Sequence, residues 1–301
     1  MTYEQFLKEV PSYLAGRFPA DTQIHIRSVL KNNDSQKDGL VISETGNTIS
    51  PTIYLNGFYR RMEEEGDSFE QVMDDVLMLY RNNRPAKDLD VDFFSDYEQV
   101  KSKVVYKLVS KQQNAKLLED VPHMEVLDLA VVFLCLFPSA EHNYSTVLIH
   151  NEHCKLWKVN GEALWEQAKV NTPRLLPYVL QPMDDVLTEL MQVDLTDEIS
   201  MQMGLHPMYV LSNQARMHGA SAILYPHMLQ EFANCMQSDF YIIPSSIHEL
   251  ILIPTGERND DARLNELIAY VNAEELQPED ILSDHVYYFS REREEILFDL
   301  V

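Results

Sequence analysis

The sequence is poor in the residues that build phosphate-binding loops and membrane spans. It has only 9 glycines in 301 residues, and it contains neither a Gly-x-x-x-x-Gly-Lys loop nor a Gly-x-Gly-x-x-Gly loop. Both loops need glycine where the backbone approaches a phosphate. No apolar run reaches the roughly 18 residues that cross a bilayer. The N-terminus MTYEQFLKEV carries acidic residues and lacks the apolar centre of a signal peptide. We therefore expect a cytoplasmic protein that does not enter a membrane.

Cysteine is scarce as well. The three cysteines, Cys135, Cys154 and Cys235, are an odd number and lie in apolar surroundings. This usage is typical of a reducing compartment, because a disulfide framework needs paired cysteines. We expect Cys135 and Cys235 to be thiols of the hydrophobic core.

Positive charge is scarce above all in the second half of the chain. The sequence has 48 acidic and 24 basic residues, which gives a net charge of −24. Residues 1–169 carry a net charge of −8 and residues 170–301 carry −16, and no lysine follows Lys169. Such a field repels nucleic-acid phosphates and attracts basic proteins or cations. We expect no direct nucleic-acid binding. The acidity either engages a basic partner or only keeps the protein soluble.

Apolar residues are abundant enough for a sizeable core. Hydrophobic side chains make up 45% of the sequence and aromatic ones 10%, which in a chain of this length supports one large domain or two smaller ones. We expect an N-terminal α+β portion at 1–118 and a C-terminal α+β portion at 119–301, or one continuous domain. Polar stretches around 82–92 and 110–122 are the candidate boundaries.

The stretch from Met208 to Pro254 organises the C-terminal portion. Apolar runs at 209–211 and 220–225 predict two strands, helical spacing predicts a helix over 228–236, and two further apolar runs predict strands at 240–243 and 250–253. A helix over 262–271 and a strand over 285–289 follow. The predicted unit is therefore ββαββαβ.

Apolar periodicity predicts the rest of the secondary structure. The fold class is α+β, with mixed, largely antiparallel sheets and packed helices. A strand over 126–137 would be central and buried, and Asp128 inside it needs a partner. The other predicted helices cover 3–14, 52–66, 68–80, 112–119, 161–171 and 183–191, and the other predicted strands cover 23–30, 40–43, 104–109 and 146–150.

A cluster of potential metal ligands follows the strand predicted at 146–150. His150, Glu152, His153 and Cys154 place two imidazoles, a carboxylate and a thiol within five residues, and a transition metal accepts such ligands. No second ligand pair of the Cys-x-x-Cys type is present to close a tetrahedral site, and the spacing is not that of His-Glu-x-x-His. The alternative is that these side chains cap the turn before Trp157.

His248 follows two serines, and this arrangement suggests a second candidate site, one for nucleophilic catalysis. Ser245 or Ser246 would act as a nucleophile if its hydroxyl bonded the imidazole and a carboxylate oriented the ring. The sequence has no Gly-x-Ser-x-Gly elbow. Two serines between strands are also ordinary turn residues.

Residues 175–215 contain acidic side chains and neither lysine nor arginine. This region is the candidate surface for a ligand or partner of positive charge. Its candidate residues are Asp184, Asp185, Asp194, Asp197 and Glu198.

Four phrases together resemble a family of uncharacterised proteins common in gut Clostridia, known only as a domain of unknown function. They are TISPTIYLN at 48–56, VLIHNEHCKLW at 147–157, NTPRLLPY at 171–178 and MYVLSNQARMHGASAILYP at 208–226. The resemblance continues into DFYIIPSSIHELILIP and LSDHVYYF and covers nearly the whole chain. The second half, from Leu156 through Pro254, is also distantly similar to another uncharacterised family, of Bacillus-type bacteria. Neither resemblance implies an activity or a catalytic residue.

Three functional hypotheses follow. The leading one is a non-enzymatic binding or regulatory protein whose acidic second half engages a basic or cationic partner. The second is a hydrolase of unrecognised class that uses His150, Glu152, His153 or His248, either with no cofactor or with a divalent metal ion held by the surplus carboxylates. The third is a nucleic-acid mimic, which requires carboxylates spaced like phosphates on one face.

Overall fold

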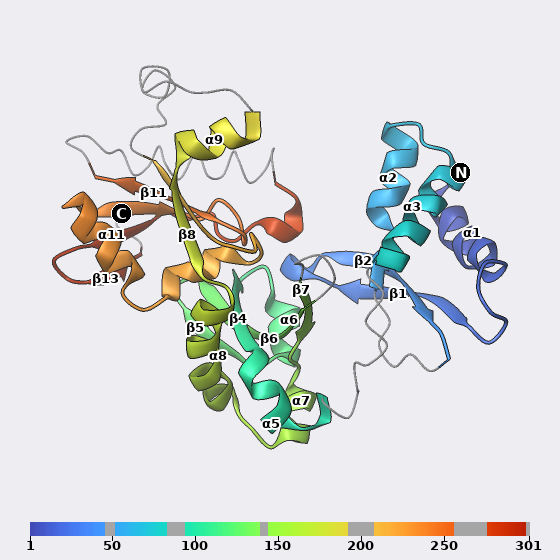
Figure 1. The fold of residues 1–301 in the computed structure, drawn as a ribbon, viewed down its shortest axis with the longest axis horizontal. Helices are drawn as coiled ribbons and strands as arrows, with labels where there is room; N and C mark the ends of the chain where they lie inside the picture. Colours follow the sequence, from blue (N-terminus) through green and yellow to red (C-terminus); the bar gives the residue numbers. More distant parts are fainter. Residues whose placement is uncertain (46–51, 83–93, 139–143, 192–207, 256–275, 299–301) are drawn as a thin grey trace. The chain divides into compact units, whose positions relative to one another are not determined.

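The computed structural model describes residues 1–45, 52–82, 94–138, 144–191, 208–255 and 276–298 (Figure 1). The chain divides into two compact units: unit 1 is Met1–Val100 with Leu136–Thr146, and unit 2 is Lys101–Cys135 with Val147–Val301. The predicted portions 1–118 and 119–301 meet within a helix of unit 2, α6 (Ala115–Asp120). The number of independently folding domains stays a prediction. The α+β class is confirmed, because antiparallel sheets and packed helices occur in both units.

Unit 1 packs helices on a small antiparallel sheet of strand order β1-β2-β3. Phe6 and Val10 of the first helix and Val72 and Met73 of a later helix lie in its core and are fully buried. The capping box of Thr2 and Gln5 starts the first helix. The elements are α1 (Tyr3–Ala15), β1 (Gln23–Leu30), η1 (Asn32–Asp34), β2 (Gln36–Ser43), β3 (Thr52–Tyr54), α2 (Asn56–Glu64), α3 (Phe69–Asn82) and α5 (Tyr97–Val100).

The predicted hairpin and the helix over 68–80 are confirmed as β1–β2 and α3. The prediction of one helix over 52–66 is wrong at its start. Ile53 instead lies in β3, where it pairs with Leu40 of β2 and is 3% exposed. Burial of this β-branched side chain against the sheet outweighs its helical spacing, and the helix begins only at Asn56.

A second sheet has the order β4-β6-β5, with β7 also paired to β6, and its strands β4 and β5 and the first part of β6 belong to unit 2. Helix α8 packs on β4, where the Thr172 hydroxyl accepts from the backbone N–H of Tyr106 at 3.0 Å. Pro173 lies within the last turn of α8, although the sequence predicted that the helix stops before it. The elements are η2 (Lys101–Lys103), β4 (Val104–Ser110), α6, β5 (His123–Val126), β6 (Leu129–Pro138), β7 (Tyr144–Leu148), α7 (Asn151–Trp157) and α8 (Gly161–Leu175).

The single strand predicted over 126–137 is wrong at its start. The chain turns at Leu127 and Asp128, and Val126 pairs with Leu129 in a tight hairpin of β5 and β6. Leu127 adopts a positive φ of 55°, which such short turns require. The remainder of the predicted strand is the buried β6. Asp128 therefore lies in a turn and not in a strand interior.

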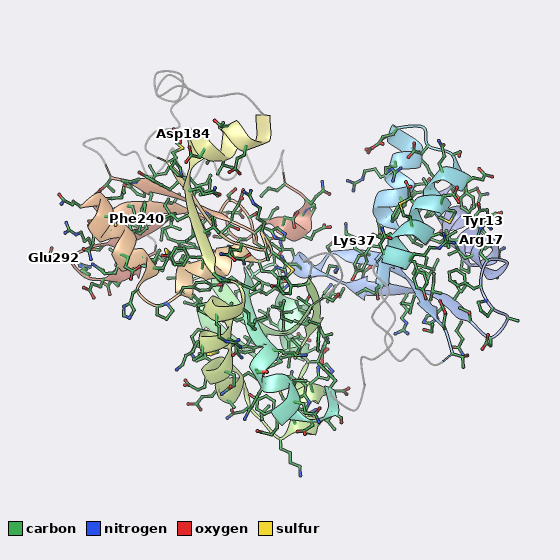
Figure 2. The ribbon with its side chains drawn as sticks, in the orientation of Figure 1. Tyr13, Arg17, Lys37, Asp184, Phe240 and Glu292 are labelled. Atoms are coloured by element: carbon green, nitrogen blue, oxygen red, sulfur yellow. The ribbon has the colours of Figure 1, made fainter. Side chains whose placement is uncertain are left out.

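A six-stranded sheet of order β13-β12-β10-β11-β9-β8 forms the rest of unit 2. Phe240 of β10, which is labelled in Figure 2, is fully buried. Its ring contacts those of Phe232 and Phe289. The elements are β8 (Tyr178–Pro182), α9 (Met183–Met191), β9 (Tyr209–Asn213), η4 (Gly219–Leu224), α11 (Met228–Met236), β10 (Phe240–Ile243), β11 (Leu250–Pro254), η5 (Pro278–Asp280), β12 (Tyr287–Ser290) and β13 (Glu295–Leu297).

The predicted ββαββαβ unit is right in its helix α11 and its strands β9, β10 and β11, and wrong at 220–225. That run forms η4, a buried 3-10 turn. Its apolar residues are buried as predicted, but burial alone does not distinguish a strand from a compact turn. The helix predicted over 262–271 lies outside the described residues. The predicted last strand is β12, and β13 follows it.

Candidate functional site

His150 and His153 stand at the start of α7, directly after β7. The Nδ1 atom of His150 lies 2.7 Å from a carboxylate oxygen of Asp120. The Nδ1 atom of His153 accepts the backbone N–H of His150 at 2.9 Å, and its ring stacks on Trp157. Burial and the neighbouring His150 lower the pKa of His153. Both imidazoles therefore take part in holding the beginning of the helix.

The geometry of this cluster gives it a local structural role. Glu152 is exposed on the first turn of α7, where a carboxylate favourably faces the helix dipole. Across the described parts of the chain, no group of three or more histidine, cysteine or acidic side chains has the arrangement of a metal site. Metal binding by His150, Glu152 and His153 stays a prediction.

His248 lies apart from that cluster, in the loop between β10 and β11. Its Nδ1 atom accepts the backbone N–H of His218 at 3.2 Å, and the two imidazole rings stack with centroids 5.7 Å apart. Its Nε2 atom lies 3.5 Å from a carboxylate oxygen of Asp280. Because an amide occupies Nδ1, the proton of the neutral ring resides on Nε2, and no lone pair is left to accept a proton from a nucleophile.

The serines of this loop bond to backbone groups. The Ser246 hydroxyl accepts the backbone N–H of His248 at 3.0 Å. The bond from a serine hydroxyl to the imidazole that nucleophilic catalysis requires is not among the hydrogen bonds of the described residues. Ser246 is therefore a turn residue in this structure, which is the alternative that the sequence left open.

A buried polar network joins this loop to the end of β9. Ser212 donates to the backbone oxygen of His248 at 2.8 Å, and Asn213, which is 1% exposed, bonds both the N–H and the carbonyl of Met217. Gly219 lies against this network, and a Cβ there would overlap the hydroxyl of Ser212 and the carbonyl of His248. The network fixes the positions of the residues on either side of it, including Glu249.

A pocket of about 270 Å³ lies beside this network, between α9 and the sheet. We call it the α9 pocket. Val179 of β8 pairs with Ser212 of β9, and Gln181 pairs with Val210, so alternate side chains of the two strands share one face. The pocket is lined by Val179, Gln181, Val186, Glu189, Val210, Ser212, Asn213, Gln214, Arg216 and Glu249.

The charged groups of the α9 pocket are two carboxylates and one guanidinium. Arg216 and Glu189 approach to 3.5 Å, and both side chains are more than half exposed, so their attraction is weak. Glu249 makes no side-chain hydrogen bond or ion pair with any other residue in the described part of the chain. Its carboxylate is thus available to a ligand.

The predicted acidic residues that the structure describes lie on α9 and do not line this pocket. Asp184 and Asp185 occupy the first turn of α9, and Figure 2 shows Asp184 at the start of that helix. Asp194, Asp197 and Glu198 lie outside the described residues. Glu249 was missed, because the sequence alone does not reveal which carboxylate borders a pocket.

Comparisons with known proteins identify a family and no activity. No curated protein matches the chain, and no solved structure matches it. None of the helices in the described ranges is long and apolar enough to cross a membrane. The sequence pattern of DUF5688, a family of unknown function, matches residues 3–291. This match covers nearly the whole chain, so the protein belongs to the DUF5688 family.

Proposed function

We propose that this protein is a non-enzymatic binding protein that holds a lysine or arginine side chain of a basic partner in the α9 pocket. The observation that carries the proposal is the Glu249 carboxylate, which borders a partly apolar pocket and has no partner among the described residues. Reduced thiols at all three cysteines are compatible with a cytoplasmic location.

The shape and lining of the pocket match such a side chain. Lysine and arginine combine an apolar stem with a cationic head. Val179, Val186 and Val210 offer the stem an apolar surface, and Glu249 offers the head a carboxylate. A volume of about 270 Å³ lies below the roughly 300–1,000 Å³ that is usual for drug-sized ligands. The pocket therefore suits one long side chain better than a whole cofactor.

The surrounding charge favours the same partner. Residues 170–301 carry a net charge of −16, and a field of this sign raises the association rate of positive partners. The hydrolase hypothesis has less support, because both ring nitrogens of His248 are engaged by neighbouring groups. The nucleic-acid mimic stays a prediction.

The proposal is tested with two pentapeptides. One is acetyl-Ser-Ala-Arg-Ala-Ser-amide, and the other carries citrulline in place of arginine, which keeps the shape and removes the charge. Isothermal titration should show binding of the arginine peptide and affinity at least about tenfold lower for the citrulline peptide. This factor corresponds to about 1.4 kcal/mol, the lower range of a hydrogen bond to a charged group.

Two variants distinguish binding in the α9 pocket from a general attraction to the acidic surface. Glu249→Gln should weaken binding of the arginine peptide about tenfold or more. Glu231→Gln removes an equal charge from the exposed side of α11, outside the pocket, and should leave binding nearly unchanged. Equal losses in both variants, or equal binding of the two peptides, would refute the proposal.

A further inference from the structure

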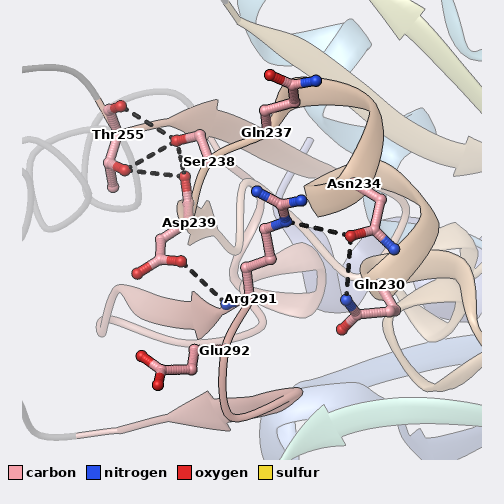
Figure 3. Close-up of a pocket in the computed structure, with 8 residues that line it drawn as sticks. All are labelled: Gln230, Asn234, Gln237, Ser238, Asp239, Thr255, Arg291 and Glu292. Carbon is pink, nitrogen blue, oxygen red and sulfur yellow. Dashed lines mark hydrogen bonds between the residues drawn. The ribbon is translucent and has the colours of Figure 1, made fainter.

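A second and larger pocket lies at the opposite edge of the six-stranded sheet, where α11, β10 and the β12–β13 turn meet (Figure 3). We call it the Arg291 pocket. It has a volume of about 580 Å³, which falls within the usual range of roughly 300–1,000 Å³ for small-molecule sites. Its lining is polar throughout and consists of Gln230, Asn234, Gln237, Ser238, Asp239, Thr255, Arg291 and Glu292.

Arg291 is held in place by two contacts that leave the end of its side chain available. Its backbone N–H donates to Asp239 at 3.0 Å, and its Nε–H donates to the amide oxygen of Asn234 at 3.1 Å. The Nη atoms make no hydrogen bond or ion pair with the described residues. A guanidinium fixed at Nε and open at both Nη atoms is prepared for a planar, two-oxygen anion such as a carboxylate.

The amide side chains of the pocket are oriented by the same contacts. The oxygen of Asn234 accepts from Gln230 Nε2 at 3.4 Å as well as from Arg291, so the Asn234 amide presents its nitrogen to the pocket as a donor. Gln230 Oε1 is buried and has no hydrogen-bond partner in the described part of the chain. Because this oxygen is buried, it does not contact a ligand in the open pocket, and the accessible polar groups are those of Arg291, Asn234 and the carboxylates.

Carboxylates complete the lining. Asp239 accepts from the Tyr288 hydroxyl at 2.6 Å and from the backbone of Arg291, which fixes its position. Glu292 is exposed at the pocket, and Figure 3 shows its carboxylate apart from the Arg291 guanidinium. The pocket therefore offers a cation at one place and anions at another.

We infer that the Arg291 pocket binds a zwitterion of the α-amino-acid type. Its carboxylate bonds the Nη atoms of Arg291, and its ammonium group bonds the exposed carboxylate of Glu292. A net-neutral ligand fits this half of the protein better than an anion does, because residues 170–301 carry a net charge of −16 and repel a free negative charge. The Arg291 pocket and the α9 pocket share no lining residue.

The test is a titration of the full-length protein with named small molecules. The probes are glycine, L-leucine, L-glutamine and L-glutamate, together with methylamine and acetate, which each keep one charged group of glycine. We expect at least one amino acid to bind with a Kd of about 1 mM or lower by isothermal titration. Methylamine and acetate should each bind at least about tenfold more weakly than the preferred amino acid, because each lacks one charged contact.

The chain offers matched controls within three residues. Arg291→Gln and Glu292→Gln should each lower the affinity about tenfold or more. Arg293→Gln and Glu294→Gln remove the same charges from neighbouring exposed residues outside the pocket. These two variants should bind with the affinity of the wild type. Circular dichroism of each variant shows whether it folds, and Arg291→Lys, which keeps the charge and loses the planar fork, should bind more weakly than the wild type.

Three results would overturn the inference. One is no heat of binding for any of the four amino acids at about 10 mM, well above the expected Kd. Another is binding of acetate as tight as that of the amino acids, which would indicate a simple anion site. The third is an equal loss of affinity in the Arg291 and Arg293 variants, which would indicate a general effect of charge.

Discussion

The hydroxyl of Tyr287 donates a hydrogen bond of 2.5 Å to the carboxylate of Asp128, although 159 positions separate the two residues in the sequence. The same carboxylate accepts the Ser283 hydroxyl at 2.6 Å and lies 3.2 Å from Nδ1 of His285. One side chain in the β5–β6 turn thereby holds the segment that leads into β12. Burial, together with the charge of Asp128, raises the pKa of Tyr287 well above its usual value.

We predict that Asp128→Asn lowers the free energy of unfolding by about 1–3 kcal/mol, because the amide offers one acceptor where the carboxylate offers two and carries no charge. Tyr287→Phe removes only the hydroxyl and should cost about 1 kcal/mol. Urea unfolding measures both. The double variant should be less destabilised than the sum of the single variants, since the two residues share one bond. Strict additivity would contradict the direct coupling.

The sequence indicated that Asp128 needs a partner but not which one. A charged residue beside a long apolar run is a local signal, and the cost of burying it unpaired is general. Ser283 and Tyr287 lie more than 150 positions away, and no periodicity relates them to Asp128. Helices α3, α9 and α11 were predicted correctly for the opposite reason, since each one carries its own amphipathic repeat.

Gly219 is predicted to tolerate no side chain. A Cβ at this position would overlap the hydroxyl of Ser212 and the backbone of His248, and backbone cannot move aside as a flexible side chain does. Gly219→Ala should destabilise unit 2 by about 2 kcal/mol or more, as overpacking of a core does. Gly57→Ala is the control, because nothing lies within 4 Å of a Cβ there. Thermal unfolding of both variants is the measurement.

A pocket is a different kind of feature from a helix, and the sequence predicted less of it. The acidic character of residues 175–215 was evident, but Asp184 and Asp185 occupy the first turn of α9 and do not line the pocket. The position of Glu249 depends on the register of three strands, in which Leu250 pairs with Leu211 and Leu211 pairs with Leu180. Register is set by packing and turn geometry across the whole sheet, so no local pattern contains it.

The three cysteines should react with thiol reagents at very different rates. Cys235 is exposed, Cys154 is half-buried and Cys135 is buried, so the sequence prediction of a core thiol is right for Cys135 and wrong for Cys235. Cys235 falls on the solvent side of α11, whereas Phe232 and Ala233 lie on the opposite side, which faces the core. Mass spectrometry after brief iodoacetamide treatment should find label first on Cys235. Label on Cys135 before global unfolding would contradict its burial.

Stability should fall as the pH rises above 9, and Cys135 should be one cause. Burial raises the pKa of the Cys135 thiol from 9.0 to about 12. A group whose pKa is higher in the folded state stabilises that state fully below its unfolded pKa, and this contribution is lost as the pH rises from 9 toward 12. At pH 10 the loss is on the order of 1 kcal/mol.

The loss of stability at alkaline pH is assigned to Cys135 by comparing how steeply the free energy of unfolding falls with pH in each protein, rather than by comparing the free energies themselves. Cys135→Ala leaves a small cavity and lowers the stability at every pH, but the fall between pH 8 and 10 should be shallower than in the wild type by on the order of 1 kcal/mol. Cys235→Ala, at the exposed position, should keep the wild-type slope. Buried tyrosines such as Tyr106 and Tyr225 also have raised pKa values, but their contribution begins to fall only near pH 10, where unfolded tyrosine ionises. The tyrosines contribute equally in all three proteins, so the difference in slope between the wild type and Cys135→Ala, from urea unfolding at pH 8, 9 and 10, isolates the thiol. Equal slopes in all three proteins would show that Cys135 does not carry the effect.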